Sequence, residues 1–250
     1  MLFINLSWKQ AGLFWGLIFV LGHLLYIDTP FVNQEYVFAE AVKSLLSPQY
    51  RIGLENYWNV QANPLGYSAI SALVNGIFHF PVGFWSVRIP SLAGGLMVIL
   101  AGGWIAKKFN FNRSRFFLWA ALIIFSPLIW VYAGRATADV LPTGLLMLSL
   151  ALCLKADENK IYNFIASVVF SISILVKYNS LLILPGFFYL FYLQNNGQLD
   201  SRFFKDSFLF IMTPLAGLVI YWWTIYERFG IFVLPDHYKV IYLRIQWTQF

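Results

Sequence analysis

Long apolar runs, separated by short polar segments, recur along most of this chain of 250 residues. The runs cover residues 11–27, 64–80, 89–106, 116–133, 140–154, 161–176, 181–193 and 208–226. Several are shorter than the roughly 20 residues that a straight helix needs to cross the hydrocarbon core of a bilayer. The pattern predicts an all-α polytopic integral membrane protein in one domain, residues 1–250, with about seven or eight transmembrane helices.

The composition agrees with lipid as the surrounding solvent. Hydrophobic residues make up 60% of the chain and charged residues only 11%, whereas soluble domains have about 45–50% and roughly 25%. Such a composition excludes a soluble enzyme and a nucleic-acid-binding module. It also excludes a disordered chain, because disordered chains have low hydrophobicity. A single cysteine, Cys153, excludes an intrachain disulfide framework or a thiolate metal cluster.

Charge asymmetry predicts the orientation in a membrane. Four cations lie close together at Lys107, Lys108, Arg113 and Arg115, and the positive-inside rule assigns them to the cytoplasm together with Lys9. An even number of crossings must then separate Lys9 from this loop. We therefore interpret residues 11–27 as a retained first span and residues 64–80, which follow Asn63 and Pro64, as an interfacial or half-inserted helix.

The same orientation places the polar segment 28–63 outside, together with residues 135–139, 177–180 and 227–250. Segment 28–63 is net acidic. Apolar residues recur at helical spacing between positions 35 and 46 and Pro48 follows, which predicts an interfacial helix there.

Charged residues near membrane spans point to function by default, although each also has a structural explanation. Asp28 follows the first run and is equally an ordinary boundary residue. Glu35 opens the predicted interfacial helix, where a carboxylate also favours the helix dipole. Arg135 and Asp139 have the spacing of a salt bridge on one helix face, and Lys177 can extend from an apolar run to the interface.

Several familiar chemistries have no motif here. The sequence contains no Walker motif, no G-x-G-x-x-G after a strand and no H-E-x-x-H, and its three histidines are dispersed. The paired glycines Gly94-Gly95 and Gly102-Gly103 are typical of close helix packing in lipid. Without a nucleotide-binding fold, group transfer would use a lipid-borne donor. No cofactor is assigned, and a divalent metal remains an open alternative.

Four segments, in order, resemble the GT-C membrane glycosyltransferases that use polyprenyl-phosphate sugars, especially protein mannosyltransferases and aminoarabinose transferases. They are Gln34-Glu35-Tyr-Val-Phe-Ala-Glu40, Asn63-Pro-Leu-Gly-Tyr67 with Arg88-Ile-Pro-Ser-Leu-Ala-Gly94, Ser126-Pro127 through Arg135-Ala-Thr-Ala-Asp139, and Val176-Lys177-Tyr178. Family members run to several hundred residues, so the resemblance covers their N-terminal part. The family's Asp-Glu pair is Gln34-Glu35 here.

The resemblance implies a GT-C-like fold and transfer of a sugar from a polyprenyl-phosphate donor to an acceptor hydroxyl on the external face. It implies Glu35, with Asp28 in reserve, as the base that takes the hydroxyl proton. Arg135, Lys177 and Arg88 would bind the donor phosphate, and Asp139 would orient Arg135. Two alternatives stay open: a non-catalytic scaffold or inactive fragment, and a transporter.

Overall fold

All regular secondary structure is helical in the part of the chain that the computed structural model describes, residues 7–32, 34–47, 54, 57–58, 61, 63–156 and 159–230. The α-helices are α1 (Trp8–Leu24), α2 (Glu35–Leu46), α4 (Gly66–Phe78), α5 (Phe84–Lys108), α6 (Arg113–Ile124), α7 (Pro127–Ala133), α8 (Val140–Cys153), α9 (Ile161–Val176), α10 (Leu184–Gln194) and α11 (Ser201–Phe229), and a 3-10 helix, η1, covers Tyr178–Ile183.

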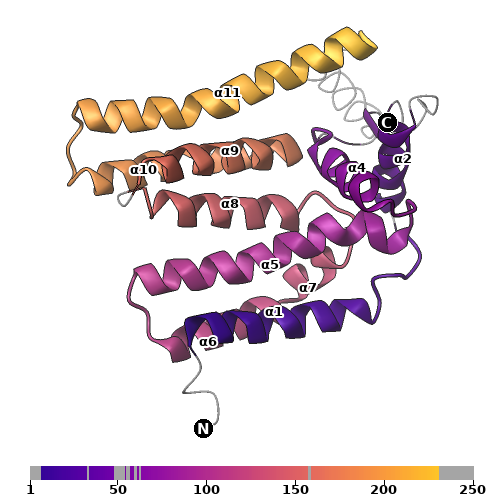
Figure 1. Ribbon diagram of the computed structural model, residues 1–250, viewed down its shortest axis with the longest axis horizontal. Coiled ribbons are helices and arrows are strands. Elements are labelled where there is room, and N and C mark those ends of the chain that lie inside the picture. Colours follow the sequence, from indigo (N-terminus) through magenta and orange to yellow (C-terminus); the bar gives the residue numbers. More distant parts are fainter. Residues whose placement is uncertain are drawn as a thin grey trace, which may run out of the picture.

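Most helices lie side by side in one stack, with α11 at one edge and α1 at the other (Figure 1). Helices α2 and α4 pack against each other across one end of this stack, which we call the α2 end. The α2 end also holds the C-terminal ends of α1, α7 and α9 and the N-terminal ends of α5 and α8. The opposite end, where α5 meets α6 and α10 meets α11, is the basic end.

The span count differs from the expectation. Among the described residues, α5 and α11 are long and apolar enough to cross a membrane, and the pair α6 and α7 makes a third crossing if it is one bent span. Seven or eight spans is therefore wrong. The other apolar runs fold into helices that are too short: α8 has 14 residues, about 21 Å at 1.5 Å per residue, against a hydrocarbon core of about 30 Å.

Prolines explain two of the interruptions. The run 116–133, expected to be one helix, is broken between α6 and α7, which meet at an angle of 60°. Pro127 lacks an N–H and disfavours helical backbone at the preceding residue, and Ser126 is extended. The run 181–193 is likewise divided, because η1 ends at Ile183 and α10 begins with Pro185 in its first turn.

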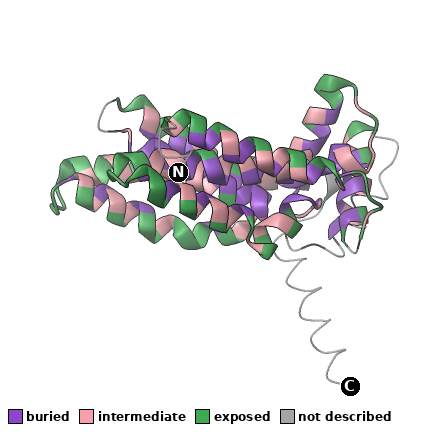
Figure 2. Cartoon of the chain, turned by 90° about the horizontal axis from the view of Figure 1, so that it is seen from below, coloured by how far each residue is buried: buried purple, intermediate pink, exposed green. Residues whose placement is uncertain are grey.

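The helix predicted at 35–46 is present as α2, and residues 64–80 contain the short helix α4 at the same end of the stack; their place relative to a membrane stays a prediction. Figure 2 shows the buried residues along the interior of the bundle and exposed residues on its outer faces. Residues 231–250, most of the segment expected to be external after position 227, lie outside the described part of the chain.

Close packing at glycines holds the stack together, as the sequence predicted for Gly94-Gly95 and Gly102-Gly103. A methyl group added at Gly94 would lie 2.5 Å from Leu141 Cα on α8. At Gly95 it would lie 2.3 Å from the Phe19 ring of α1, and at Gly102 it would lie 2.0 Å from the Trp119 ring of α6. These positions let α5 contact helices on both of its sides.

Candidate functional site

A buried ion pair between α2 and α5 lies at the α2 end. Arg88 donates from Nε to Glu35 Oε1 at 2.8 Å and from Nη2 to Glu35 Oε2 at 2.9 Å. Both side chains are only 1% exposed. The carboxylate also accepts hydrogen bonds from the backbone N–H groups of Ala136, at 2.7 Å, and Val32, at 2.8 Å. Glu35 therefore joins α2, α5 and the segment between α7 and α8.

The remaining donors of Arg88 bind the backbone that follows α1. Nη1 donates to the carbonyls of Ile27 and Thr29, both at 2.7 Å, and Nη2 contacts the Pro30 carbonyl at 3.3 Å. With the two bonds to Glu35, all five N–H donors of the guanidinium are engaged. Arg88 therefore has no N–H donor left to bind a donor phosphate, which is the role that the family resemblance implied.

The surroundings of Glu35 also make it a poor proton acceptor. Burial raises the pKa of its carboxyl group, but hydrogen bonds from Arg88, Ala136 and Val32 outweigh that effect and hold the pKa below its ordinary value of 4.5. A base of low pKa that is closed off from solvent cannot reach an acceptor hydroxyl. The geometry favours a structural role for Glu35.

Asp28 is placed differently. It follows the last turn of α1, is exposed to solvent, and lines a groove of about 370 Å³ beside α2 and the start of α5. The groove also contains Phe31, Tyr36, Trp85 and the carboxylate of Glu40. Of the two acids considered from the sequence, Asp28 is the one that an acceptor can reach.

Arg135 and Asp139 lie in the turn between α7 and α8, which is not helical. Their i, i+4 spacing therefore does not place them on one helix face, and the salt bridge considered from the sequence is not formed. Asp139 instead accepts a hydrogen bond from Lys177 Nζ at 2.6 Å, and both side chains are partly exposed. Asp139 thus positions Lys177 rather than Arg135.

Arg135 is half-buried, and its side chain has no hydrogen bond or ion pair within the residues that the structure describes. It immediately precedes Ala136, whose N–H binds Glu35. The pair of Glu35 and Arg88 therefore fixes the backbone beside Arg135. Asp139, four residues further along the same turn, binds Lys177, which follows α9.

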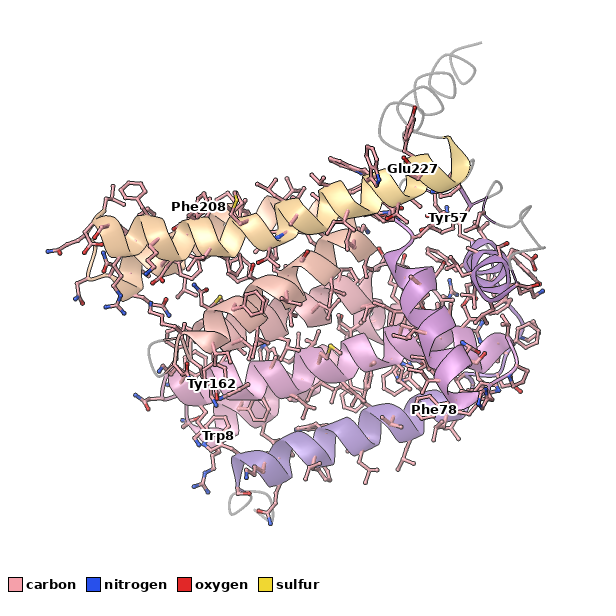
Figure 3. All side chains as sticks on the ribbon, turned by 45° about the horizontal axis from the view of Figure 1, so that its top comes forward. Trp8, Tyr57, Phe78, Tyr162, Phe208 and Glu227 are labelled. Carbon is pink, nitrogen blue, oxygen red and sulfur yellow. The ribbon has the colours of Figure 1, made fainter. Side chains whose placement is uncertain are left out.

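Aromatic side chains gather around Tyr178, the residue that follows Lys177. Tyr178, next to Lys177, accepts a hydrogen bond from Trp222 Nε1 at 3.2 Å. Tyr221 accepts one from the Leu65 N–H at 3.0 Å, and Tyr57 donates to the Pro64 carbonyl at 2.8 Å. Burial raises the pKa of Tyr57, so this hydroxyl stays protonated. Figure 3 shows Tyr57 and Glu227 at the α2 end and Trp8 and Tyr162 at the basic end.

A second polar connection joins the second and third of the four sequence segments singled out above. The Tyr67 hydroxyl contacts Ser91 Oγ at 2.9 Å, and Ser91 Oγ donates to the Thr137 carbonyl at 3.2 Å. A methyl group at Gly66 would lie 2.2 Å from the Leu175 carbonyl oxygen, so the start of α4 also contacts the end of α9. The candidate residues thus come from segments that are far apart in the sequence and meet at the α2 end.

Sequence reasoning missed several contributors. The backbone N–H of Ala136, which completes the shell of Glu35, has no side-chain signal that a sequence could show. Tyr221 and Trp222 lie in a long apolar helix, where aromatic residues are ordinary. No group of three His, Cys, Asp or Glu side chains suited to a metal ion occurs within the described ranges. No protein-family model, curated protein sequence or solved structure matches this chain.

Proposed function

We propose that this protein is a membrane glycosyltransferase that moves a sugar from a polyprenyl-phosphate donor to an acceptor hydroxyl on the external face of the membrane. The observation that carries the proposal is the half-buried guanidinium of Arg135, which has no partner among the described residues. A partly buried guanidinium gains from an anionic partner, and a phosphate at this position would supply one.

In this proposal Lys177 is the second cation, because its partner Asp139 lies in the same turn as Arg135. The Lys177 ammonium is directed by Asp139 and is partly exposed. An arginine fork and a nearby ammonium suit the phosphate of a lipid-linked sugar, because the leaving phosphate gains negative charge as its bond to the sugar breaks. Tyr178, which follows Lys177, and its partner Trp222 would offer flat apolar faces to a lipid or a sugar ring.

In the proposed reaction, the acceptor oxygen attacks the anomeric carbon of the sugar and forms the new C–O bond. The bond between the anomeric carbon and the donor phosphate oxygen breaks, and the polyprenyl phosphate leaves with the electron pair. The acceptor proton passes to a carboxylate. Asp28 is our candidate for that carboxylate, because it is exposed and lines a groove with Phe31, Tyr36 and Trp85, whereas Glu35 is enclosed.

A non-catalytic scaffold is the second candidate. Gln34 stands where the resembled family has aspartate, and its side-chain oxygen accepts a hydrogen bond from Gln61 at 2.8 Å. A glutamine at this position cannot take a proton. On this alternative, Arg135 and Lys177 would bind a lipid phosphate without cleaving it.

An activity assay separates these candidates. The purified full-length protein in detergent is incubated with a polyprenyl-phosphate hexose and a glycolipid acceptor. Glycosyl transfer requires release of free polyprenyl phosphate, and Asp28→Asn should lower that rate by about 10²–10⁴-fold. Glu40→Gln, which removes another carboxylate of the same groove, is the matched control and should retain activity. Donor binding without release would establish the scaffold, and turnover of a nucleotide sugar without lipid carrier would overturn the donor assignment.

A further inference from the structure

The basic end of the bundle contains a cavity that the proposed reaction does not use. Its volume is about 630 Å³, and it lies between the start of α9 and the first turns of α11. Lys160, Arg202 and Lys205 line it, together with Asp206. Asp206 contacts Lys160 Nζ at 2.5 Å and Arg202 Nε at 4.0 Å. One carboxylate is thus shared by two of the three cations.

The helix dipoles do not account for these cations. Lys160 is the N-cap residue of α9, and Arg202 and Lys205 lie in the first two turns of α11. Helix N-termini carry partial positive charge and favour anions. At α11 the Asp200 carboxylate supplies one by accepting from the N–H groups of Arg202 and Phe203, and the three cations outnumber the two described carboxylates, Asp200 and Asp206. Lys205 is exposed and has no ion pair or hydrogen bond within the described part of the chain. The cavity is complementary to an anion.

An unpaired polar group also lines the cavity. Asn163 is 5% exposed, and its Oδ1 atom has no hydrogen-bond partner within the residues that the structure describes. Its amide nitrogen contacts the Asp206 carbonyl at 3.5 Å. Because buried amide oxygens are nearly always hydrogen-bonded, a donor group that reached this atom would satisfy it. A headgroup hydroxyl beside a phosphate would supply that donor.

Beside the cations, the cavity is apolar. Phe164 and Leu209 line it and are 62% and 52% exposed. Beyond Leu209, the outer face of α11 continues with exposed Met212, Leu215 and Val219. Since α11 is long and apolar enough to cross a membrane, a hydrocarbon chain that starts at the cavity would remain beside apolar surface along this helix.

From this combination we infer that the cavity between α9 and α11 binds an anionic phospholipid that carries a headgroup hydroxyl, of the phosphatidylglycerol type. Lys160, Arg202 and Lys205 contact the phosphodiester, Asn163 accepts from the hydroxyl, and Phe164 and Leu209 contact an acyl chain. The sequence predicts this end to be cytoplasmic, where anionic lipids and basic pockets between helices commonly meet.

Native mass spectrometry of the full-length protein tests the site. The protein is exchanged into detergent with equal amounts of phosphatidylglycerol and phosphatidylcholine that have the same acyl chains. We expect preferential retention of phosphatidylglycerol, and a loss of about tenfold or more in the double variant K160Q/K205Q. R113Q/R115Q removes the same charge from the same end, outside the cavity, and should retain the lipid.

Two further measurements test the lipid site. Phe164→Ser changes no charge and should also reduce retention, because it removes an acyl-chain contact. Excess inorganic phosphate should not displace the lipid. Equal retention of the two lipids, an equal loss in R113Q/R115Q, or displacement by phosphate alone would each overturn the site. Glycosyl transfer is measured separately, so failure here leaves the proposed function untouched.

Discussion

Arg88 and Glu35, 53 residues apart in the sequence, form two parallel hydrogen bonds of 2.8 and 2.9 Å within a region closed to solvent. The pair joins α5 to α2, and its outer contacts hold the chain after α1 and the turn between α7 and α8. The backbone beside Asp28 and Arg135 is therefore positioned by one interaction that takes no part in the proposed chemistry.

Breaking this pair should destabilise the fold. Glu35→Gln or Arg88→Met leaves one buried polar partner uncompensated, which costs about 3–5 kcal/mol. The double variant should lose less than the sum of the two, because no lone charge remains. Denaturant unfolding in detergent, followed by tryptophan fluorescence, measures both. Lys43→Gln breaks the exposed pair with Glu40 and should cost less than about 1 kcal/mol. Additive losses at positions 35 and 88 would contradict a coupled pair.

The same carboxylate predicts an acid sensitivity. Its pKa in the folded protein is held below 4.5, so its stabilising contribution is fully present above the unfolded value and is lost as the pH falls through the folded pKa. The melting temperature of the wild type should exceed that of Glu35→Gln near neutral pH, and the difference should shrink in acid below about pH 4.3. A constant difference down to pH 3 would show that Glu35 does not titrate in this way.

Arg135→Ala should weaken both donor affinity and turnover, because the guanidinium is proposed to contact the phosphate before and during bond cleavage. We expect KM for the lipid-linked sugar to rise, and kcat to fall, by about tenfold or more each. Arg115→Ala removes an exposed arginine at the basic end and serves as the control. Unchanged kinetics in Arg135→Ala would remove the observation on which the proposed function rests.

The two ends of the bundle should lie on opposite sides of the membrane. Ser47, which follows α2, and Ser114, in the first turn of α6, are both exposed. Each is replaced by cysteine in a Cys153→Ala background and treated with an impermeant thiol reagent on intact cells. Position 47 should label and position 114 should not. The reverse result would invert the orientation, and labelling of both would contradict a membrane between them.

Gly94→Ala should destabilise the protein by overpacking the contact between α5 and α8. Its new methyl group would lie 2.5 Å from Leu141 Cα, a backbone atom that cannot rotate away. We expect a loss of about 1–3 kcal/mol in unfolding free energy from overpacking. Gly12→Ala, whose methyl group would meet a leucine side chain at 3.5 Å, is the matched control and should be close to neutral. Equal stability of the two variants would show that α5 and α8 can move apart.

Apolar composition and helical periodicity determined much of this protein before tertiary structure. They predicted an all-α chain, the helix at 35–46 and the packing role of Gly94, because these depend on local sequence and on the solvent. The number of spans was wrong, because hydropathy does not show where Pro127 or Pro185 interrupts a helix or how far each helix extends.

Tertiary structure decided the roles of the charged residues. Sequence spacing paired Arg135 with Asp139, but the turn before α8 is not helical, and Asp139 meets Lys177 instead. Glu35 was selected as an acid near a membrane surface, yet its partners Arg88 and Ala136 lie 53 and 101 positions away. Whether a carboxylate can take a proton from a substrate depends on which distant groups bury it and bind it. Those contacts form only when the chain packs.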